Sequence, residues 1–285
     1  MTSATHTPPE LTIQPRDIAF GRDTPMQRWW LGGDPVATAF FNALSATFPL
    51  GERFFMDAVR RYRAEAPPAL QAQIGAFISQ EAMHTREHIF FNKQITGHGY
   101  DVGAMEARTK AMIDFARAQE PLAQLGATIA LEHFTAILAH AVLADPRHLE
   151  KASDEARAMW RWHAIEEVEH KAVAFDTFMV AARELRPARR WFMRCMTMMI
   201  STGRLVSTIT LNMAEIFTAD GINRPRTWAR TIGFLFGRPG ILRQILGDYL
   251  TYFLPRFHPW RRDDRALAAG AARDLGEIGG VAYAA

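Results

Sequence analysis

The sequence predicts an all-α fold with a four-helix bundle at its centre, and three observations support this prediction. Long segments with helical periodicity are separated by Pro, Gly and Asp turns. Residue patterns typical of strands are scarce. Two Glu-x-x-His pairs each follow a single Glu in an earlier helical segment: Glu52 precedes Glu81/His84, and Glu132 precedes Glu167/His170. This order is typical of a bundle in which two helices contribute one Glu and two contribute Glu-x-x-His.

The first half of the bundle is expected after an N-terminal coil over residues 1–25. Asp34-Pro35 provides the N-cap and first-turn proline that begin a helix. Further helices are expected over 48–66 and 69–97, and Pro67-Pro68 between them predicts an αα-hairpin.

The second half repeats this plan and ends the predicted bundle, residues 26–187. A connecting helix is expected over 100–118, a helix over 121–143, a turn at Asp145-Pro146 and a long helix over 149–185. Both hairpins are long enough to bring their Glu and His residues to one height.

The composition changes after Pro187, where a C-terminal helical extension over 188–265 is expected to pack on the bundle. Its first part is a Met-rich amphipathic helix, and residues 224–265 combine arginines with aromatic side chains. The Ala- and Gly-rich end, 266–285, predicts a flexible tail. We expect these parts to form a single domain overall.

Composition excludes several classes of protein. A hydrophobic content of 48% supports a large core, and a net charge of +3 is too weak to imply nucleic-acid binding. Cys195 is the only cysteine, so an intrachain disulfide or a thiolate metal site cannot form. No segment matches a signal peptide or membrane span, and we expect a cytoplasmic protein with peripheral membrane contact as an alternative.

The Glu and His pattern predicts a dinuclear metal site. In a helix, residues i and i+3 share a face, so each pair presents an oxygen and a nitrogen to one point. His163 lies on the same stripe as Glu167 and is expected as a seventh ligand. The predicted ligands are Glu52, Glu81, His84, Glu132, His163, Glu167 and His170.

Charge favours two metal ions over one, because four carboxylates match two divalent cations in a bundle interior. Carboxylate and imidazole ligands suit iron, with manganese as an alternative, whereas zinc would be expected to use fewer carboxylates.

Nearby residues have secondary roles in this prediction. His88 is expected behind the ligands or in a pocket wall, and Asp57 and Asp176 are candidate partners for the outer nitrogens of ligand imidazoles. Glu166 and Glu169 are expected to be solvated.

Three segments, FNALSATFPLGERFF, ISQEAMHTREHIFFN and HAIEEVEHKAVAFD, resemble the bacterial family of predicted metal-dependent hydrolases, a ferritin-like group. That resemblance implies a ferritin-like four-helix bundle over about residues 15–255. The ligand motifs are also similar to those of di-iron arylamine N-oxygenases, in which an additional His joins four Glu and two His. This similarity implies the same role for His163 but does not extend to an arylamine substrate.

The leading functional hypothesis is a di-iron oxygenase that uses O2 and an unidentified electron donor to oxygenate a small apolar organic substrate. A two-metal hydrolase is the alternative, and a metal-storage or interaction module is a third. For the Arg and aromatic cluster at 224–265 we favour a helical cap on the bundle, with docking on an anionic membrane as the alternative. The Met-rich segment 191–213 favours core packing, with a homodimer face as the alternative.

Overall fold

The computed structural model describes residues 7–8 and 10–279. The regular secondary structure of these residues consists of helices. No strand occurs within these residues, and Leu31 and Ala152 form an isolated bridge. The predicted all-α fold class is confirmed.

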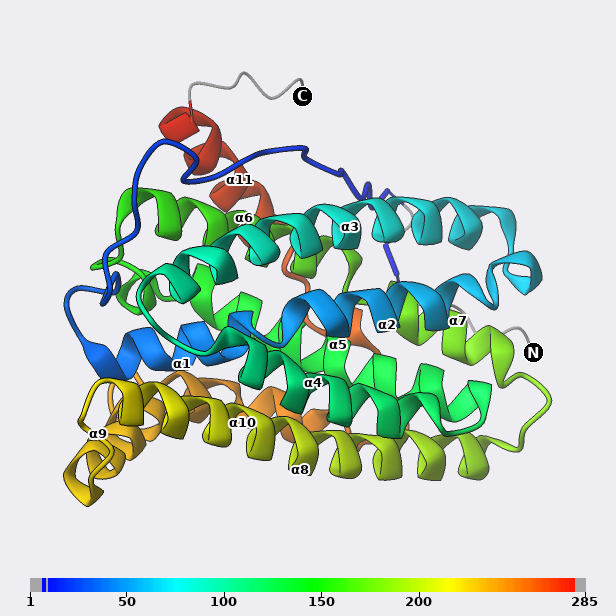
Figure 1. Cartoon of the computed structure of the whole chain (residues 1–285). Helices are drawn as coiled ribbons and strands as arrows, with labels where there is room; N and C mark the ends of the chain where they lie inside the picture. Colours follow the sequence, from blue (N-terminus) through cyan, green and yellow to red (C-terminus); the bar gives the residue numbers. More distant parts are fainter. Residues whose placement is uncertain (1–6, 9, 280–285) are drawn as a thin grey trace.

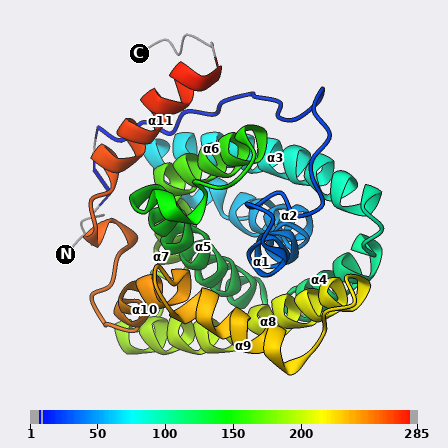
Figure 2. The ribbon, with the colours of Figure 1, turned by 90° about the vertical axis from the view of Figure 1, so that its left-hand side faces the viewer.

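Four helices form the central bundle: α2 (Phe48–Arg60), α3 (Pro68–Gly97), α5 (Pro121–Ala144) and α6 (Asp154–His170). Helix α2 packs against α3 and α5, and α6 packs against the same two helices (Figures 1 and 2). These are the helices expected to carry the Glu and His motifs. Their arrangement turns four separate stretches of sequence into the walls of one interior.

Capping and proline residues set where most of the helices begin. The Asp34 carboxylate accepts hydrogen bonds from the backbone N–H groups of Val36 and Ala37 and begins α1 (Pro35–Ser45). Helices α3 and α5 each begin with a proline. Helix α2 ends at Arg60, and the remainder of its predicted length contains the short 3-10 helix η1 (Arg63–Glu65).

The long helix expected over 149–185 is two helices. Residues before Asp154 include the 3-10 helix η2 (Pro146–His148), and the chain breaks at Lys171-Ala172 before α7 (Val173–Ala181). Lys171 is buried and its Nζ donates to Asp264 Oδ2 at 2.6 Å and to the Arg262 carbonyl oxygen at 2.8 Å. The helix thus breaks at a residue that contacts a distant part of the chain. Local periodicity did not predict this break.

The C-terminal helices cover one side of the bundle. Helix α8 (Pro187–Ala219) packs on α1, α5 and α4 (Val102–Arg117), while α9 (Pro225–Phe236) packs on α1, and α10 (Ile241–Thr251) packs on α5. Met213 and Phe217 of α8 belong to the main hydrophobic core. In Figures 1 and 2 these three helices form the lower side of the molecule, and α3, α6 and α11 form the upper side.

The end of the chain differs from the predicted flexible tail. The 3-10 helix η3 (Pro259–Arg261) precedes α11 (Arg265–Gly279), which packs against α6 with Ala268, Ala271 and Leu275 buried. A small-residue face permits close helix approach, so a segment of low hydrophobicity still packs. Residues 266–279 of the predicted tail are therefore helical, and residues 280–285 lie outside the described part.

Among the described residues, α5 is the one helix with the length and apolar composition to cross a membrane, and 67% of its most apolar stretch is buried inside the protein. It is the central helix of the bundle, and a buried core helix meets the same criteria.

Candidate metal centre

The four bundle helices bring all seven predicted ligands to one buried point. Glu52 comes from α2, Glu81 and His84 from α3, Glu132 from α5, and the remaining three from α6. Each of the seven is at most 3% exposed. Four sets of donors have atoms within 4.8 Å of one another. Two of them share Glu81, Glu52/Glu81/His84 and Glu81/Glu132/His170, and the others are His84/His163/Glu167 and Glu52/His88/His163.

Two carboxylates lie between the imidazoles of these sets. Glu81 Oε1 lies 3.2 Å from His170 Nε2, and Glu81 Oε2 lies 3.9 Å from His84 Nδ1. Glu167 has the same relation, with Oε2 3.5 Å from His170 Nε2 and Oε1 3.6 Å from His84 Nδ1. Each carboxylate thus has one oxygen near His84 and one near His170, so Glu81 and Glu167 would hold cations on either side.

The donor atoms satisfy a specific test for bound cations. Eight buried polar atoms at this point have no hydrogen-bond partner: Glu52 Oε1, both oxygens of Glu81 and of Glu132, Glu167 Oε2, His84 Nδ1 and His170 Nε2. Buried polar atoms without partners are rare in folded proteins. Two donors each about 2.1 Å from one ion, at about 90°, lie about 3 Å apart, close to several of the separations seen here. The residues present therefore fit two metal ions.

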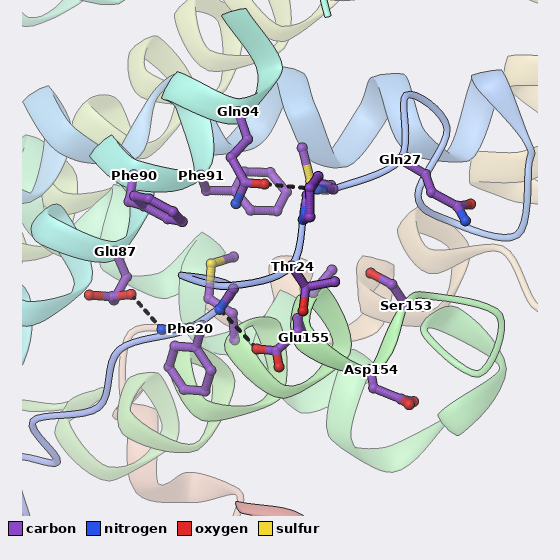
Figure 3. A pocket seen from close by; sticks show the side chains of 15 residues that line it. Phe20, Thr24, Gln27, Glu87, Phe90, Phe91, Gln94, Ser153, Asp154 and Glu155 are labelled. Atoms are coloured by element: carbon purple, nitrogen blue, oxygen red, sulfur yellow. Dashed lines mark hydrogen bonds between the residues drawn. The ribbon is translucent and has the colours of Figure 1, made fainter. Parts of the chain in front are cut away.

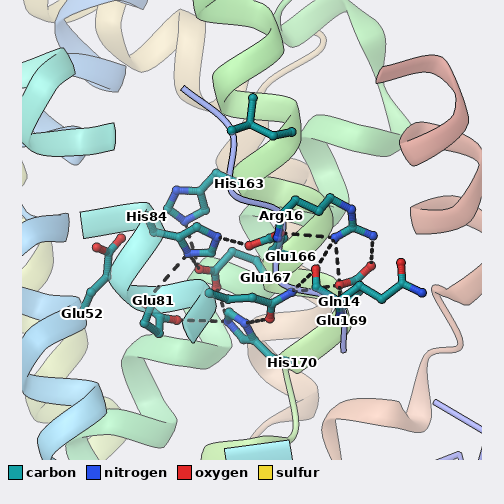
Figure 4. A network of polar contacts seen from close by, with 12 residues as sticks. Gln14, Arg16, Glu52, Glu81, His84, His163, Glu166, Glu167, Glu169 and His170 are labelled. Carbon is teal, nitrogen blue, oxygen red and sulfur yellow. Dashed lines mark hydrogen bonds and ion pairs between the residues drawn. The ribbon is translucent and has the colours of Figure 1, made fainter. Parts of the chain in front are cut away.

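The outer nitrogens of two imidazoles are held by buried side chains (Figure 4). His84 Nε2 donates to Glu166 Oε2 at 3.0 Å, and His170 Nδ1 donates to Gln80 Oε1 at 2.9 Å. Both contacts leave the other ring nitrogen facing the site. Residues that orient a metal-bound imidazole in this way tune its affinity for the metal.

His163 is oriented by a chain of hydrogen bonds. Ser45 Oγ donates to Asn92 Oδ1 at 2.7 Å, so it can accept from His88 Nδ1 at 2.8 Å. His88 Nε2 is then the acceptor for His163 Nδ1 at 2.7 Å. A neutral His163 in this tautomer has its lone pair on Nε2, which lies 2.9 Å from Glu167 Oε1. The arrangement suits His163 as a metal ligand and places His88 behind it.

Several predicted secondary roles are wrong. Asp57 lies on the surface with its side chain 50% exposed, and pairs with Arg117 and Arg60. Asp176 is buried but pairs with His258 and Thr7. Neither reaches the predicted ligand imidazoles, because a one-residue step on a helix turns a side chain by about 100° toward a different neighbour.

Glu166 and Glu169 are engaged rather than solvated. The N-terminal segment crosses α3 and α6, and Arg16 donates to Glu166 Oε1 from its backbone N–H at 2.8 Å and from its guanidinium at 3.3 Å. The same guanidinium donates to both oxygens of Glu169. Glu166 and Gln80 each directly precede a predicted ligand in the sequence. This position does not indicate which residue the side chain contacts, so the sequence did not predict either role.

Electrostatics show what the carboxylates require. Burial raises the pKa of Glu52 and Glu132 well above the usual glutamate value, and the negative charge of Glu81 raises it further. Burial would lower the pKa of His84, but its hydrogen bond to Glu166 and the nearby carboxylates of Glu167 and Glu81 outweigh it and raise the pKa to about 10. Burial lowers the pKa of His163 to about 4, so this imidazole is neutral at physiological pH. The interior therefore needs cations, either protons or metal ions.

An apolar cavity of about 30 Å³ reaches two of the donors. His163 and Glu167 form its polar end, and Phe40, Phe48 and Ile241 are among its apolar walls. A cavity of this volume accommodates a molecule about as large as water. Larger molecules would need the apolar side chains to move.

A larger cavity of about 300 Å³ lies between the N-terminal segment and helices α3 and α6 (Figure 3). Its polar groups hold that segment: Glu87 accepts from the Phe20 N–H, Glu155 from the Gly21 N–H, and Gln94 from the Met26 N–H. None of the seven predicted ligands lines it.

A family model described as predicted metal-dependent hydrolase matches residues 14–263, a range that includes all seven donors. The chain belongs to this family. The resemblance to predicted metal-dependent hydrolases is thus confirmed, and metal dependence has support from both the family and the buried Glu and His groups. The searches of curated proteins and of solved structures find no match.

Proposed function

We propose that this protein is a two-metal hydrolase acting on a small apolar organic substrate. The observation that carries the proposal is the pair of carboxylates, Glu81 and Glu167, that each offer one oxygen to either side of the site. The family's description supports the same class of reaction. Iron is the metal that we propose, with manganese as the alternative, because oxygen and imidazole donors suit both.

The metal ions, when bound, would polarise a substrate oxygen and lower the pKa of a water molecule to supply a nucleophile. The chain's own residues fix the geometry around them. Glu166, Gln80 and His88 hold the outer nitrogens of the three imidazoles. Phe48 packs on both His163 and His88, and Trp162 packs edge-on against His84. These rings keep bulk water away from the donors.

The apolar cavity supports the proposed substrate class. Its walls come from α1, α2, α5, α6 and α10, and its polar end is formed by His163 and Glu167. Because the cavity of about 30 Å³ admits a molecule about as large as water, an organic substrate would enter after the Phe and Leu side chains of its walls move, with its reacting oxygen toward the donors.

Oxygenation of such a substrate is the second candidate function. The donor set favours it, because four carboxylates and three imidazoles suit a metal that changes its oxidation state. The cavity also accommodates a molecule as small as O2. This reaction would need an external electron donor.

The test compares the wild-type protein with Glu81→Gln and with the exposed control Glu150→Gln. Metal analysis should find about two metal ions per chain in the wild type and the control, and less than one in Glu81→Gln. Aryl and alkyl esters assayed under anaerobic conditions should be hydrolysed by the first two proteins and lose at least about 100-fold in kcat/KM in the third.

The same samples separate the two candidates. O2 uptake after anaerobic reduction, without ester hydrolysis, would replace the hydrolase proposal with the oxygenase. Fewer than one metal ion per wild-type chain after loading with iron or manganese would contradict both.

A further inference from the structure

Helix α8 exposes a long face without charge. Six large apolar side chains on it are between 37% and 59% exposed: Phe192, Met196, Met199, Ile200, Val206 and Leu211. The other exposed positions between them are Gly203, Ser207 and Thr210. The two arginines in this stretch do not interrupt it, because Arg194 is buried and Arg204 stacks on Phe115. The uncharged face extends about 30 Å along the helix.

Helices α9 and α10, which follow α8 in the chain, also expose apolar side chains. Ile232 and Phe236 of α9, and Leu246 and Leu250 of α10, are between 51% and 61% exposed. All three helices lie on the lower side of the molecule in both views (Figures 1 and 2). We call the exposed apolar residues of α8, α9 and α10 the apolar face. Soluble proteins rarely leave so extended an apolar surface without a partner.

The same part of the chain has an excess of positive charge. Residues 186–250 contain ten arginines, no lysine and three acidic residues, Glu215, Asp220 and Asp248. All three acids are already paired, Glu215 with Arg108, Asp220 with Arg28 and Asp248 with Arg262. Within the described residues, Arg189, Arg190 and Arg226 form no ion pair with an acidic side chain, so their charges are free for an external partner.

Charge also distinguishes between two occupants of the apolar face. In a symmetric dimer each face would meet its own copy, which would bring arginine-rich surfaces together. An anionic lipid surface instead offers hydrocarbon to the apolar side chains and negative headgroups to the arginines.

We propose that the protein is a peripheral membrane protein that docks on anionic lipid bilayers through the apolar face, with the neighbouring arginines on the headgroups. Ile241, the first residue of α10, lines the cavity that ends at His163 and Glu167. Because Ile241 is buried, a substrate dissolved in the bilayer would have to pass α10 to reach the metal centre, a consequence that rests on the proposed function. The docking itself does not depend on it.

Vesicle flotation of the full-length, metal-loaded protein tests the proposal. The probes are phosphatidylcholine vesicles with and without phosphatidylserine, at low salt and at about 0.5 M NaCl. One variant removes three arginines, Arg189→Gln, Arg190→Gln and Arg226→Gln. Its control, Lys93→Gln with Lys151→Gln and Arg273→Gln, removes the same number of positive charges outside α8, α9 and α10. A third variant, Phe192→Ser with Leu246→Ser and Leu250→Ser, removes apolar groups, and Ile89→Ser on α3 is its control.

We expect the wild type to float with anionic vesicles and to bind less at high salt. The triple arginine variant should lose on the order of 100-fold in partitioning, since each basic residue near an anionic surface contributes about fivefold. The apolar variant should lose binding at both salt concentrations, while both controls bind like the wild type. All substituted residues are at least partly exposed, so circular dichroism and Tm should remain unchanged.

Three results would overturn the proposal. One is a wild-type protein that does not float with anionic vesicles. Another is an equal loss in the lysine and arginine control, which would indicate net charge alone. The third is a wild-type dimer that the apolar variant converts to a monomer without loss of flotation, because the apolar face would then join two subunits. Metal content is measured on the same samples, so failure of docking and failure of the metal centre are distinguishable.

Discussion

Glu132 shows at the scale of one residue why the centre needs cations. Both of its oxygens are buried without a hydrogen-bond partner, and burial raises its pKa well above the usual glutamate value. The carboxylate therefore destabilises the metal-free protein and, as a predicted ligand, stabilises the metal-bound one.

The substitution Glu132→Gln should therefore stabilise the metal-free protein and destabilise the metal-bound protein. In the presence of a chelator we expect Tm to rise by roughly 2–4 °C, the shift that corresponds to about 1 kcal/mol in a chain of this size. With metal added, the increase in Tm on loading should be smaller than in the wild type. Differential scanning calorimetry of both states, with Glu150→Gln as a control, measures this. A fall of Tm in both states would show that Glu132 contributes only packing.

At the scale of elements, the connection between α6 and the C-terminal region depends on Asp264. Its carboxylate accepts from Lys171 Nζ at 2.6 Å and from His140 Nδ1 at 3.0 Å, close to the start of α11. Burial alone would raise the pKa of Asp264, but its hydrogen bonds and charge interactions with His140 and Lys171 lower it below the usual value.

A lowered folded-state pKa stabilises the protein above the unfolded-state value, which is about 3.9, and this contribution is lost as pH falls through the folded-state pKa. Asp264→Asn should therefore reduce the free energy of unfolding by about 1–3 kcal/mol at pH 7. The difference should shrink as the pH falls below about 4. Urea unfolding across this range measures it. The adjacent, exposed Asp263→Asn is the control, and an equal loss in that variant would argue against a specific contact at Asp264.

Helix limits were predictable where local chemistry sets them. Asp34-Pro35 and Pro121 begin helices as expected, because a cap or a first-turn proline acts within a few residues. The break at Lys171 and the packing of α11 on α6 were not predictable. Both depend on contacts between segments about 90 residues or more apart in sequence.

At the scale of the whole molecule, metal binding and folding should be linked. The donors come from four helices that meet only in the folded bundle. A ligand that binds only the folded state stabilises it by about 2.7 kcal/mol at a concentration 100 times Kd. Removing metal with a chelator should therefore lower Tm by roughly 5–10 °C, and adding iron or manganese should restore it. Equal Tm values with and without metal would contradict a site that joins the four helices.

The sequence by itself determined the helical class and the Glu and His residues that meet in the bundle. Those features are local: periodicity sets a helix, and i, i+3 spacing puts Glu and His on one face. Only the tertiary structure decided which side chains support the imidazoles. Glu166 and Gln80 took that role in place of Asp57 and Asp176, because a hydrogen bond between helices depends on their packing and rotation. The tertiary structure also decided that the apolar residues of α8 to α10 remain exposed, since periodicity shows that a helix has an apolar side but not what covers it.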